Sequence, residues 1–184
     1  MGTAPDRESA DRAAEWVPLE SLLATVDDVG LSAVLSPAER AWIRERIEDV
    51  RGQIAGLDWP LGTGLIHGDA WAGNLLARLG KQPADVVLGD WDWVSIGPRE
   101  IDLIPTWHAA TRYGKGQSWV SDFVDRYGYD LAEWDGYPQL MAMRDLVQLS
   151  GPIRRARAGN RYESALRQRL DSLLAEDSVT WIGL

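Results

Sequence analysis

The spacing of apolar residues changes twice along this chain, and this change limits the possible folds more than any other feature. Between residues 18 and 57 apolar side chains recur three and four positions apart, whereas between residues 65 and 93 they form short runs bounded by Gly, Asp or Asn. Beyond Pro98 the earlier spacing returns. The first pattern is typical of helices and the second of short strands. The sequence therefore predicts an α+β, mostly helical fold with a small central β-element.

The predicted helix that follows Ser36 has the clearest start signal. Ser36 is suited to be the N-cap, Pro37 the first helical residue, and Glu39 the residue that closes a capping box. Its buried stripe is predicted to consist of Trp42, Ile43, Ile47, Val50, Ile54 and Leu57. The other predicted helices cover residues 18–26, 98–113, 117–127, 136–158 and 161–175, and the predicted strands cover residues 65–66, 75–77 and 86–88.

The length and composition fit a single domain. A chain of 184 residues with 45% apolar content can bury one hydrophobic core. Residues 1–14 are small and charged, so we predict a disordered leader there and one domain over residues 15–184. The absence of Cys excludes disulfides and thiolate metal sites, and the N-terminal residues do not resemble a signal peptide or a membrane span. We expect a cytoplasmic protein.

The net charge narrows the class of partner. A formal charge of -9 argues against nucleic acid and against an anionic membrane, because both attract an excess of Lys and Arg. It favours a cationic small molecule. The same acidic balance also serves simply to keep a protein in solution, so the charge alone does not decide between these two interpretations.

Polar residues gather in the central segment, at the predicted strand ends and turns where side chains can converge. They are His67, Asp69, Asn74, Asp90, Asp92 and Asp102. A carboxylate, an amide oxygen five residues later and a second carboxylate after the next strand form a suitable set of ligands for Mg²⁺. This cation takes hard oxygen ligands, and one or two from the protein suffice when phosphate and water supply the rest.

The central segment also resembles a known family. The stretches that carry the resemblance are His67-Gly68-Asp69-x4-Asn74 and Gly89-Asp90-Trp91-Asp92-x4-Gly97-x4-Asp102-Leu103. They are similar to the two signatures of the aminoglycoside phosphotransferase and choline kinase superfamily, which shares the protein-kinase-like fold. Two positions depart from the usual pattern: Trp71-Ala72 replaces His-Pro in the loop, and Gly89 replaces an aliphatic residue.

The resemblance implies a role for each polar residue. Asp69 matches the catalytic Asp, which accepts the proton of the substrate hydroxyl, while Asn74 and Asp90 match the residues that hold Mg²⁺. Asp92 is expected either to supply a further contact to the metal or to cap a turn. Two residues are expected to support the structure instead, with Asp102 bracing the backbone of the catalytic loop and His67 packed as a scaffold.

By the same resemblance, the chain corresponds to the C-terminal lobe of a kinase that moves the γ-phosphate of ATP or GTP to a hydroxyl of a small molecule. An aminoglycoside antibiotic is one candidate acceptor, which would imply antibiotic resistance. No G-x-G-x-x-G motif is present, and the only lysines, Lys81 and Lys115, follow Asp69, so we expect the N-lobe to be absent. No nucleotide-binding residue can be named. We therefore expect weak or no activity from the chain alone, and either a separate N-lobe chain or self-association.

Two alternatives remain beside the kinase. The apolar run 86–88 followed by Asp90-Trp91-Asp92 is also the pattern of a D-x-D phosphatase, although that chemistry needs further strands and a later Lys, whereas here helices follow. The second alternative is a binding module, in which a kinase-like lobe or a fragment of one holds a ligand without turnover.

Overall fold

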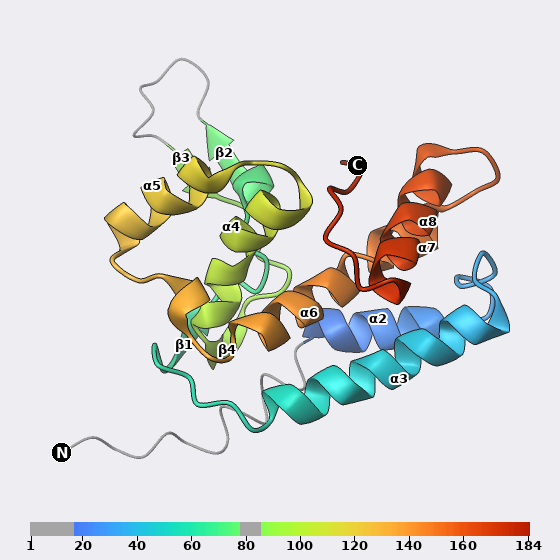
Figure 1. Cartoon of the computed structure of the whole chain (residues 1–184), viewed down its shortest axis with the longest axis horizontal. Coiled ribbons are helices and arrows are strands. Elements are labelled where there is room, and N and C mark those ends of the chain that lie inside the picture. Colours follow the sequence, from blue (N-terminus) through green and yellow to red (C-terminus); the bar gives the residue numbers. More distant parts are fainter. Residues whose placement is uncertain (1–16, 78–85) are drawn as a thin grey trace.

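The computed structural model describes residues 17–77 and 86–184, so the predicted leader lies outside the described residues. The mostly helical α+β architecture is confirmed (Figure 1). The α-helices are α2 (Val17–Asp27), α3 (Pro37–Ile54), α4 (Glu100–Arg112), α5 (Gln117–Tyr127), α6 (Tyr137–Val147), α7 (Ser150–Arg155) and α8 (Arg161–Leu174). The 3-10 helices are η1 (Ala72–Asn74) and η2 (Leu131–Glu133), and the strands are β1 (Thr63–Ile66), β2 (Leu75–Ala77), β3 (Val86–Leu88) and β4 (Ser95–Pro98).

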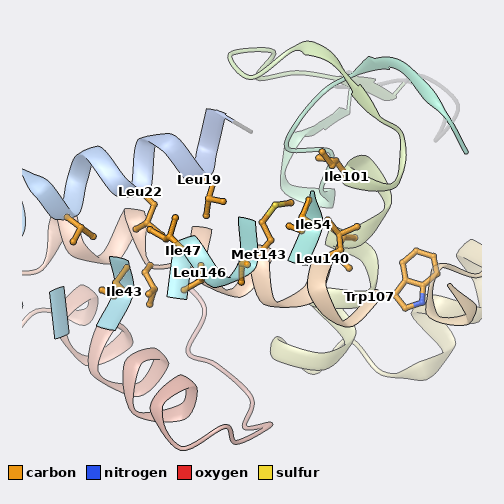
Figure 2. Close-up of a cluster of buried hydrophobic side chains, with 14 of the residues drawn as sticks. Leu19, Leu22, Ile43, Ile47, Ile54, Ile101, Trp107, Leu140, Met143 and Leu146 are labelled. Carbon is orange, nitrogen blue, oxygen red and sulfur yellow. The ribbon is translucent and has the colours of Figure 1, made fainter. Parts of the chain in front are cut away.

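Helix α6 lies at the centre of the packing and contacts α2, α3 and α4. Figure 2 shows the side chains that fill the space between these helices. They are Leu19 and Leu22 of α2, Ile43, Ile47 and Ile54 of α3, Leu140, Met143 and Leu146 of α6, and Ile101 and Trp107 of α4. Because apolar residues on helix α6 face three neighbours at once, its few charged residues must find partners within the protein.

The start of α3 forms as the sequence predicts. The Ser36 hydroxyl accepts a hydrogen bond from the Glu39 backbone N–H at 3.2 Å, and the Glu39 carboxylate accepts one from the Ser36 N–H at 2.6 Å. Pro37 occupies the first turn. These bonds satisfy backbone groups that have no partner inside the helix. Of the predicted stripe, Ile43, Ile47, Val50 and Ile54 are buried, whereas Trp42 and Leu57 are half-buried at its edge.

The β-element consists of two separate antiparallel pairs, β1 with β4 and β2 with β3. The three predicted strands are confirmed, but the sequence analysis missed β4. Its residues Ser-Ile-Gly-Pro include one large apolar side chain and two turn formers, so the strand depends on its pairing with β1 instead of on its own composition. Several apolar side chains of the four strands are exposed, namely Leu65, Leu75, Leu76, Val86, Val87 and Ile96.

The single helix predicted over residues 136–158 is wrong, because the chain forms α6 and α7 with a break at Gln148 and Leu149. Pro152 explains the break. A proline ring clashes with the carbonyl four residues earlier in a continuous helix, and here that carbonyl belongs to Gln148. Pro152 is tolerated within α7 because it lies in the first turn, where its missing N–H has no intrahelical partner. The break leaves the Gln148 carbonyl free for another donor.

Over the part of the chain that the structure describes, no helix combines the length and apolar character needed to cross a bilayer.

Candidate active site

The loop after β1 is held by a carboxylate from the first turn of α4. The two oxygens of Asp102 accept hydrogen bonds from the backbone N–H groups of His67 and Gly68, at 2.7 and 2.8 Å. Gly68 has a φ of 81°, and a Cβ there would lie 2.6 Å from the Trp93 carbonyl oxygen. A side chain at this position would therefore displace the loop, so the turn before Asp69 requires glycine.

The imidazole of His67 connects this loop to the end of β3. It is buried, and its Nδ1 accepts a hydrogen bond from the Asp69 backbone N–H at 3.3 Å. The ring must then carry its proton on Nε2, which donates to the Gly89 carbonyl at 2.8 Å. The Trp91 indole packs against the ring, with 4.7 Å between the ring centroids. These contacts place His67 among the groups that shape the loop.

Asn74 ties the same loop to the same strand. Its Nδ2 donates to the Asp69 carbonyl oxygen at 2.8 Å and lies 3.5 Å from the Asp69 Oδ2. The Gly89 N–H donates to the Asn74 carbonyl at 2.8 Å, and a Cβ on Gly89 would lie 2.7 Å from a methyl carbon of Leu76. The absence of a side chain at Gly89 thus permits the close approach. Because the amide nitrogen of Asn74 is engaged, its oxygen is the atom that remains for a ligand.

Asp90 and Asp92 follow directly after this junction. Both side chains are exposed, and neither forms a hydrogen bond or ion pair with any residue that the structure describes. Asp90 has a φ of 62°, which is uncommon for a residue other than glycine and is concentrated at functional positions. Among residues 17–77 and 86–184, no group of three or more His, Cys, Asp or Glu side chains forms a metal cluster.

Asp69 has a partner that the sequence analysis did not anticipate. Its Oδ1 lies 2.8 Å from an Nη of Arg144, whose side chain is 7% exposed against 27% for Asp69. Arg144 belongs to α6, and its Nε is buried without a hydrogen-bond partner. A charged residue inside an apolar helical stripe was the signal that could have identified it, since such a residue needs a partner within the fold.

A cavity of about 780 Å³ opens beside Asp69. Its walls come from the loop at η1, from α4, from the segment that leads into α5, from the junction of α6 and α7, and from α8 and the residues after it. Aromatic walls are provided by Trp71, Tyr113, Trp119 and Trp181. The Asp69 carboxylate therefore borders a space that a small organic molecule can fill.

A second ionic cluster lies on the next residue of α6. The Asp145 carboxylate accepts two hydrogen bonds from Arg112, at 3.0 and 2.7 Å, and lies 3.0 Å from the Nε2 of His108. Burial lowers the pKa of His108 below its ordinary value, and the hydrogen bond to Asp145 opposes this shift without cancelling it. Arg112 also donates to the Asp177 carbonyl at 2.9 Å, which anchors the segment after α8.

Comparisons with known proteins agree with the fold. The model of the phosphotransferase enzyme family (APH) matches residues 2–141. A search of curated proteins finds no match. Among solved structures, the amicoumacin kinase hAmiN in complex with AMP-PNP, Ca²⁺ and Ami superposes with a TM-score of 0.60 at 14% sequence identity, which shows a shared fold.

That superposition covers 94% of this chain and 60% of the amicoumacin kinase chain. The fold is accordingly that of the C-terminal lobe of the protein-kinase-like fold, as the resemblance implies. The family match spans most of the chain and includes the loop with Asp69 and Asn74 as well as the junction at Gly89 and Asp90. The chain therefore belongs to the phosphotransferase enzyme family.

Proposed function

We propose that this chain carries the catalytic loop and the acceptor pocket of a small-molecule kinase, which moves the γ-phosphate of ATP or GTP to a hydroxyl group. The observation that carries the proposal is the position of Asp69, which is fixed by loop hydrogen bonds at the wall of the 780 Å³ cavity. A kinase needs a positioned carboxylate next to a space for the alcohol, because phosphoryl transfer depends mainly on orientation and charge neutralisation.

Asp69 is proposed to act as the catalytic base. The hydroxyl oxygen of the acceptor forms the new bond to the γ-phosphorus, the bond to the β-phosphate oxygen breaks, and the hydroxyl proton passes to the Asp69 carboxylate. Its Oδ2 is the oxygen for this transfer, since Oδ1 is engaged by Arg144. Arg144 would keep the carboxylate in one orientation while the alcohol approaches.

Asn74 and Asp90 are proposed to hold the metal, with Asp92 as a further ligand. Their oxygens are the hard donors that Mg²⁺ prefers, and two protein ligands are enough when phosphate oxygens and water complete the octahedron. Asp90 and Asp92 have no competing partner among the described residues, and the Asn74 amide is already oriented by its bond to Asp69. Bound Mg²⁺ would neutralise charge on the nucleotide phosphates.

The proposal also includes a protein partner, a class of acceptor and a cellular location. The exposed apolar side chains of β1 to β4 would contact further protein. That protein would be either an N-lobe that completes the nucleotide cleft, on the same or a separate chain, or a second copy of this chain. An aminoglycoside remains a candidate acceptor, with a role in antibiotic resistance and a cytoplasmic location. The D-x-D phosphatase gains no support, because β3 belongs to a two-stranded antiparallel sheet and helices follow β4.

One observation favours a second candidate, a binding module without turnover. The ion pair between Asp69 and Arg144 occupies one oxygen of the proposed base before any substrate arrives. If Arg144 held the carboxylate permanently, the cavity would still bind a ligand but no proton would be accepted.

An assay of γ-phosphate transfer from labelled ATP or GTP to a panel of alcohols, with Mg²⁺, separates the two candidates. We expect Asp69→Asn to lower the rate by about 10²- to 10⁴-fold, because general-base catalysis is lost. Asp125→Asn, in an exposed position on α5, is the matched control and should leave the rate unchanged. Transfer that survives Asp69→Asn would end the role of Asp69 as catalytic base. Ligand binding without nucleotide binding, measured by calorimetry, would support the module and contradict the kinase.

A further inference from the structure

The side chains around the large cavity carry an excess of positive charge. Among the described lining residues, the ionisable side chains are Asp69, Arg144, Arg169 and Lys115, together with His108 and Tyr113. Burial lowers the pKa of His108 and raises that of Tyr113, so both are neutral near pH 7. The charges of Asp69 and Arg144 compensate each other across 2.8 Å. Arg169 and Lys115 therefore remain as two cations without a carboxylate partner in the cavity wall.

Arg169 is built into the wall in a way that a solvated arginine is not. It is 2% exposed and donates hydrogen bonds to the backbone carbonyls of Gln148, at 2.5 Å, and Ile182, at 3.2 Å. Its guanidinium lies over the rings of Trp181 and Tyr113, 5.3 and 5.9 Å from their centroids. Neutral carbonyls and aromatic faces orient a cation but do not cancel its charge.

Two further observations show that this cation is incompletely satisfied. The Nε of Arg169 is buried without a hydrogen-bond partner, and within the described residues no carboxylate lies within ion-pair distance of its guanidinium. Burial lowers the pKa of Arg169 below its ordinary value. The Asp145 carboxylate opposes this shift only from beyond ion-pair distance and is already engaged by Arg112 and His108. An anion that enters the adjoining cavity would therefore offset the cost of burying this cation.

The break between α6 and α7 provides one of the two carbonyls. In a continuous helix the Gln148 carbonyl would accept the N–H of residue 152, but that residue is proline and has no N–H. The carbonyl accepts the Arg169 guanidinium instead. Pro152 thus fixes the cation at the cavity wall through a local backbone effect.

The cavity also has flat apolar walls. Trp71 and Trp119 are partly exposed, Trp181 is buried, and the ammonium group of Lys115 lies 5.8 Å from the centroid of the Trp119 ring. Indole faces favour planar or ring-shaped ligands, and the nearby ammonium adds a second positive charge at the opening. Rings and cations together suit a ring compound that carries a negative charge.

We propose that the acceptor bound in this cavity is a hydroxylated ring compound with an anionic group, a carboxylate or a phosphate, that pairs with Arg169 and Lys115. The inference rests on the proposed function, in which this cavity holds the alcohol beside Asp69. It runs opposite to the cationic substrate that the net charge of -9 favours, because the charge next to the ligand outweighs the average over the surface. A polycation such as an aminoglycoside would meet two positive charges in the cavity, so the inference argues against that candidate acceptor.

A matched set of three probes tests the inference: para-hydroxymethylbenzoate, para-hydroxymethylbenzamide and para-hydroxymethylbenzylamine. They share the ring and the hydroxyl and differ in one group, which is anionic, neutral or cationic. Binding is measured by calorimetry and by saturation-transfer NMR on the whole chain without nucleotide. We expect the benzoate to bind about tenfold or more tightly than the other two, since a charge-assisted hydrogen bond is formed only with the anion.

Variants assign the preference to particular residues. Arg169→Met should abolish the preference for the benzoate, while Arg169→Lys should retain part of it. Lys115→Met is a second, exposed test that does not disturb the core and should lower the preference several-fold. Arg126→Met, an exposed position on α5 outside the cavity, is the matched control and should leave all three affinities unchanged.

Each other outcome contradicts the inference. Equal binding of the three probes, tighter binding of the benzylamine, binding of none at millimolar concentration, or a preference that survives both Arg169→Met and Lys115→Met would overturn it. Its failure is distinguishable from failure of the proposed function, because the probe measurements need neither nucleotide nor turnover. If the chain preferred the benzoate but transferred no phosphate, the anion site would be supported and the kinase proposal contradicted.

Discussion

Consecutive residues of α6, Arg144 and Asp145, belong to two ion pairs whose carboxylates have different surroundings. Asp145 is itself part of α6 and is bound by both nitrogens of an Arg112 fork and by His108, with its side chain 8% exposed. Asp69 contacts the preceding residue, Arg144, through one oxygen, and its side chain is 27% exposed at a cavity wall. The first carboxylate has its partners in the core, and the second has one partner and an open side.

This difference separates a structural ion pair from one that fits catalysis. A buried carboxylate with bidentate and imidazole partners cannot accept a further proton or ligand without losing a bond that holds helices together. Asp69 keeps its Oδ2 at a weak 3.5 Å contact with Asn74, so that oxygen remains open to a substrate. The number of satisfied lone pairs therefore distinguishes the two roles better than the presence of an arginine does.

The largest expected effect comes from removing the charge of each carboxylate in turn. Asp145→Asn should lower the free energy of unfolding by about 3 to 5 kcal/mol, because Arg112 becomes an uncompensated buried charge. Asp69→Asn, the matched variant, should lower it by less, about 1 to 3 kcal/mol. It also leaves a buried arginine, Arg144, without a counter-charge, but the amide oxygen still accepts its single hydrogen bond and the 27% exposed side chain of residue 69 keeps that pair in contact with solvent. Urea unfolding followed by circular dichroism measures both. Equal losses in the two variants would show that the two sites do not differ in the way described.

An intermediate effect is expected for the carboxylate that braces the loop. Asp102→Asn replaces one acceptor oxygen by an amide group that faces a backbone N–H, so we expect a loss of about 1.5 to 3 kcal/mol of stability. The hydrogen exchange of the His67 and Gly68 amides should accelerate, and phosphate transfer should slow. Asp122→Asn, an exposed position on α5, is the control. Unchanged exchange at both amides would contradict the bracing role.

The smallest effect is a dependence of stability on pH at the core site. Unfolded His108 takes up a proton near pH 6.5, whereas burial makes the folded protein do so only at lower pH. Below about pH 6.5 the unfolded state binds more protons than the folded state. The free energy of unfolding therefore falls as the pH decreases, by at most about 1.4 kcal/mol per pH unit.

The same contribution should be missing in His108→Gln. The difference in unfolding free energy between the wild type and this variant should therefore shrink between about pH 7 and about pH 5. Both proteins share every other titrating group, so the subtraction isolates His108. A difference that stays constant over this range would mean that the histidine is not held neutral by the core.

Local signals in the sequence predicted the elements that depend on neighbours along the chain. Ser36, Pro37 and Glu39 mark the start of α3 through bonds that span only three residues, and the apolar runs mark β1, β2 and β3. The sequence did not reveal β4, which depends on pairing with a distant strand, or the break before α7. Pro152 marks the break, but a proline also fits in the first turn of a helix, so its presence alone does not show where α6 ends.

In the candidate site, too, local sequence patterns predicted some residues and not others. The motif residues were found because their order along the chain matches a family, and the structure joins Asp69 and Asn74 to the junction at Gly89. Arg144 and Arg169 were missed, since they come from distant helices and have no motif of their own. Tertiary packing brings their charges to the cavity, with Arg144 of α6 against Asp69 and Arg169 of α8 against the Gln148 carbonyl between α6 and α7.

The adjacency of Arg144 and Asp145 on α6 links the two ionic sites mechanically. Consecutive residues of a helix cannot rotate or slide separately, so a shift of α6 that released Arg144 from Asp69 would also pull Asp145 from Arg112. The loop that carries Asp69 is thus tied to the core through two consecutive residues of α6. A substitution that rotated this helix would weaken both ion pairs, so few substitutions on α6 can change the shape of the pocket without a loss of stability.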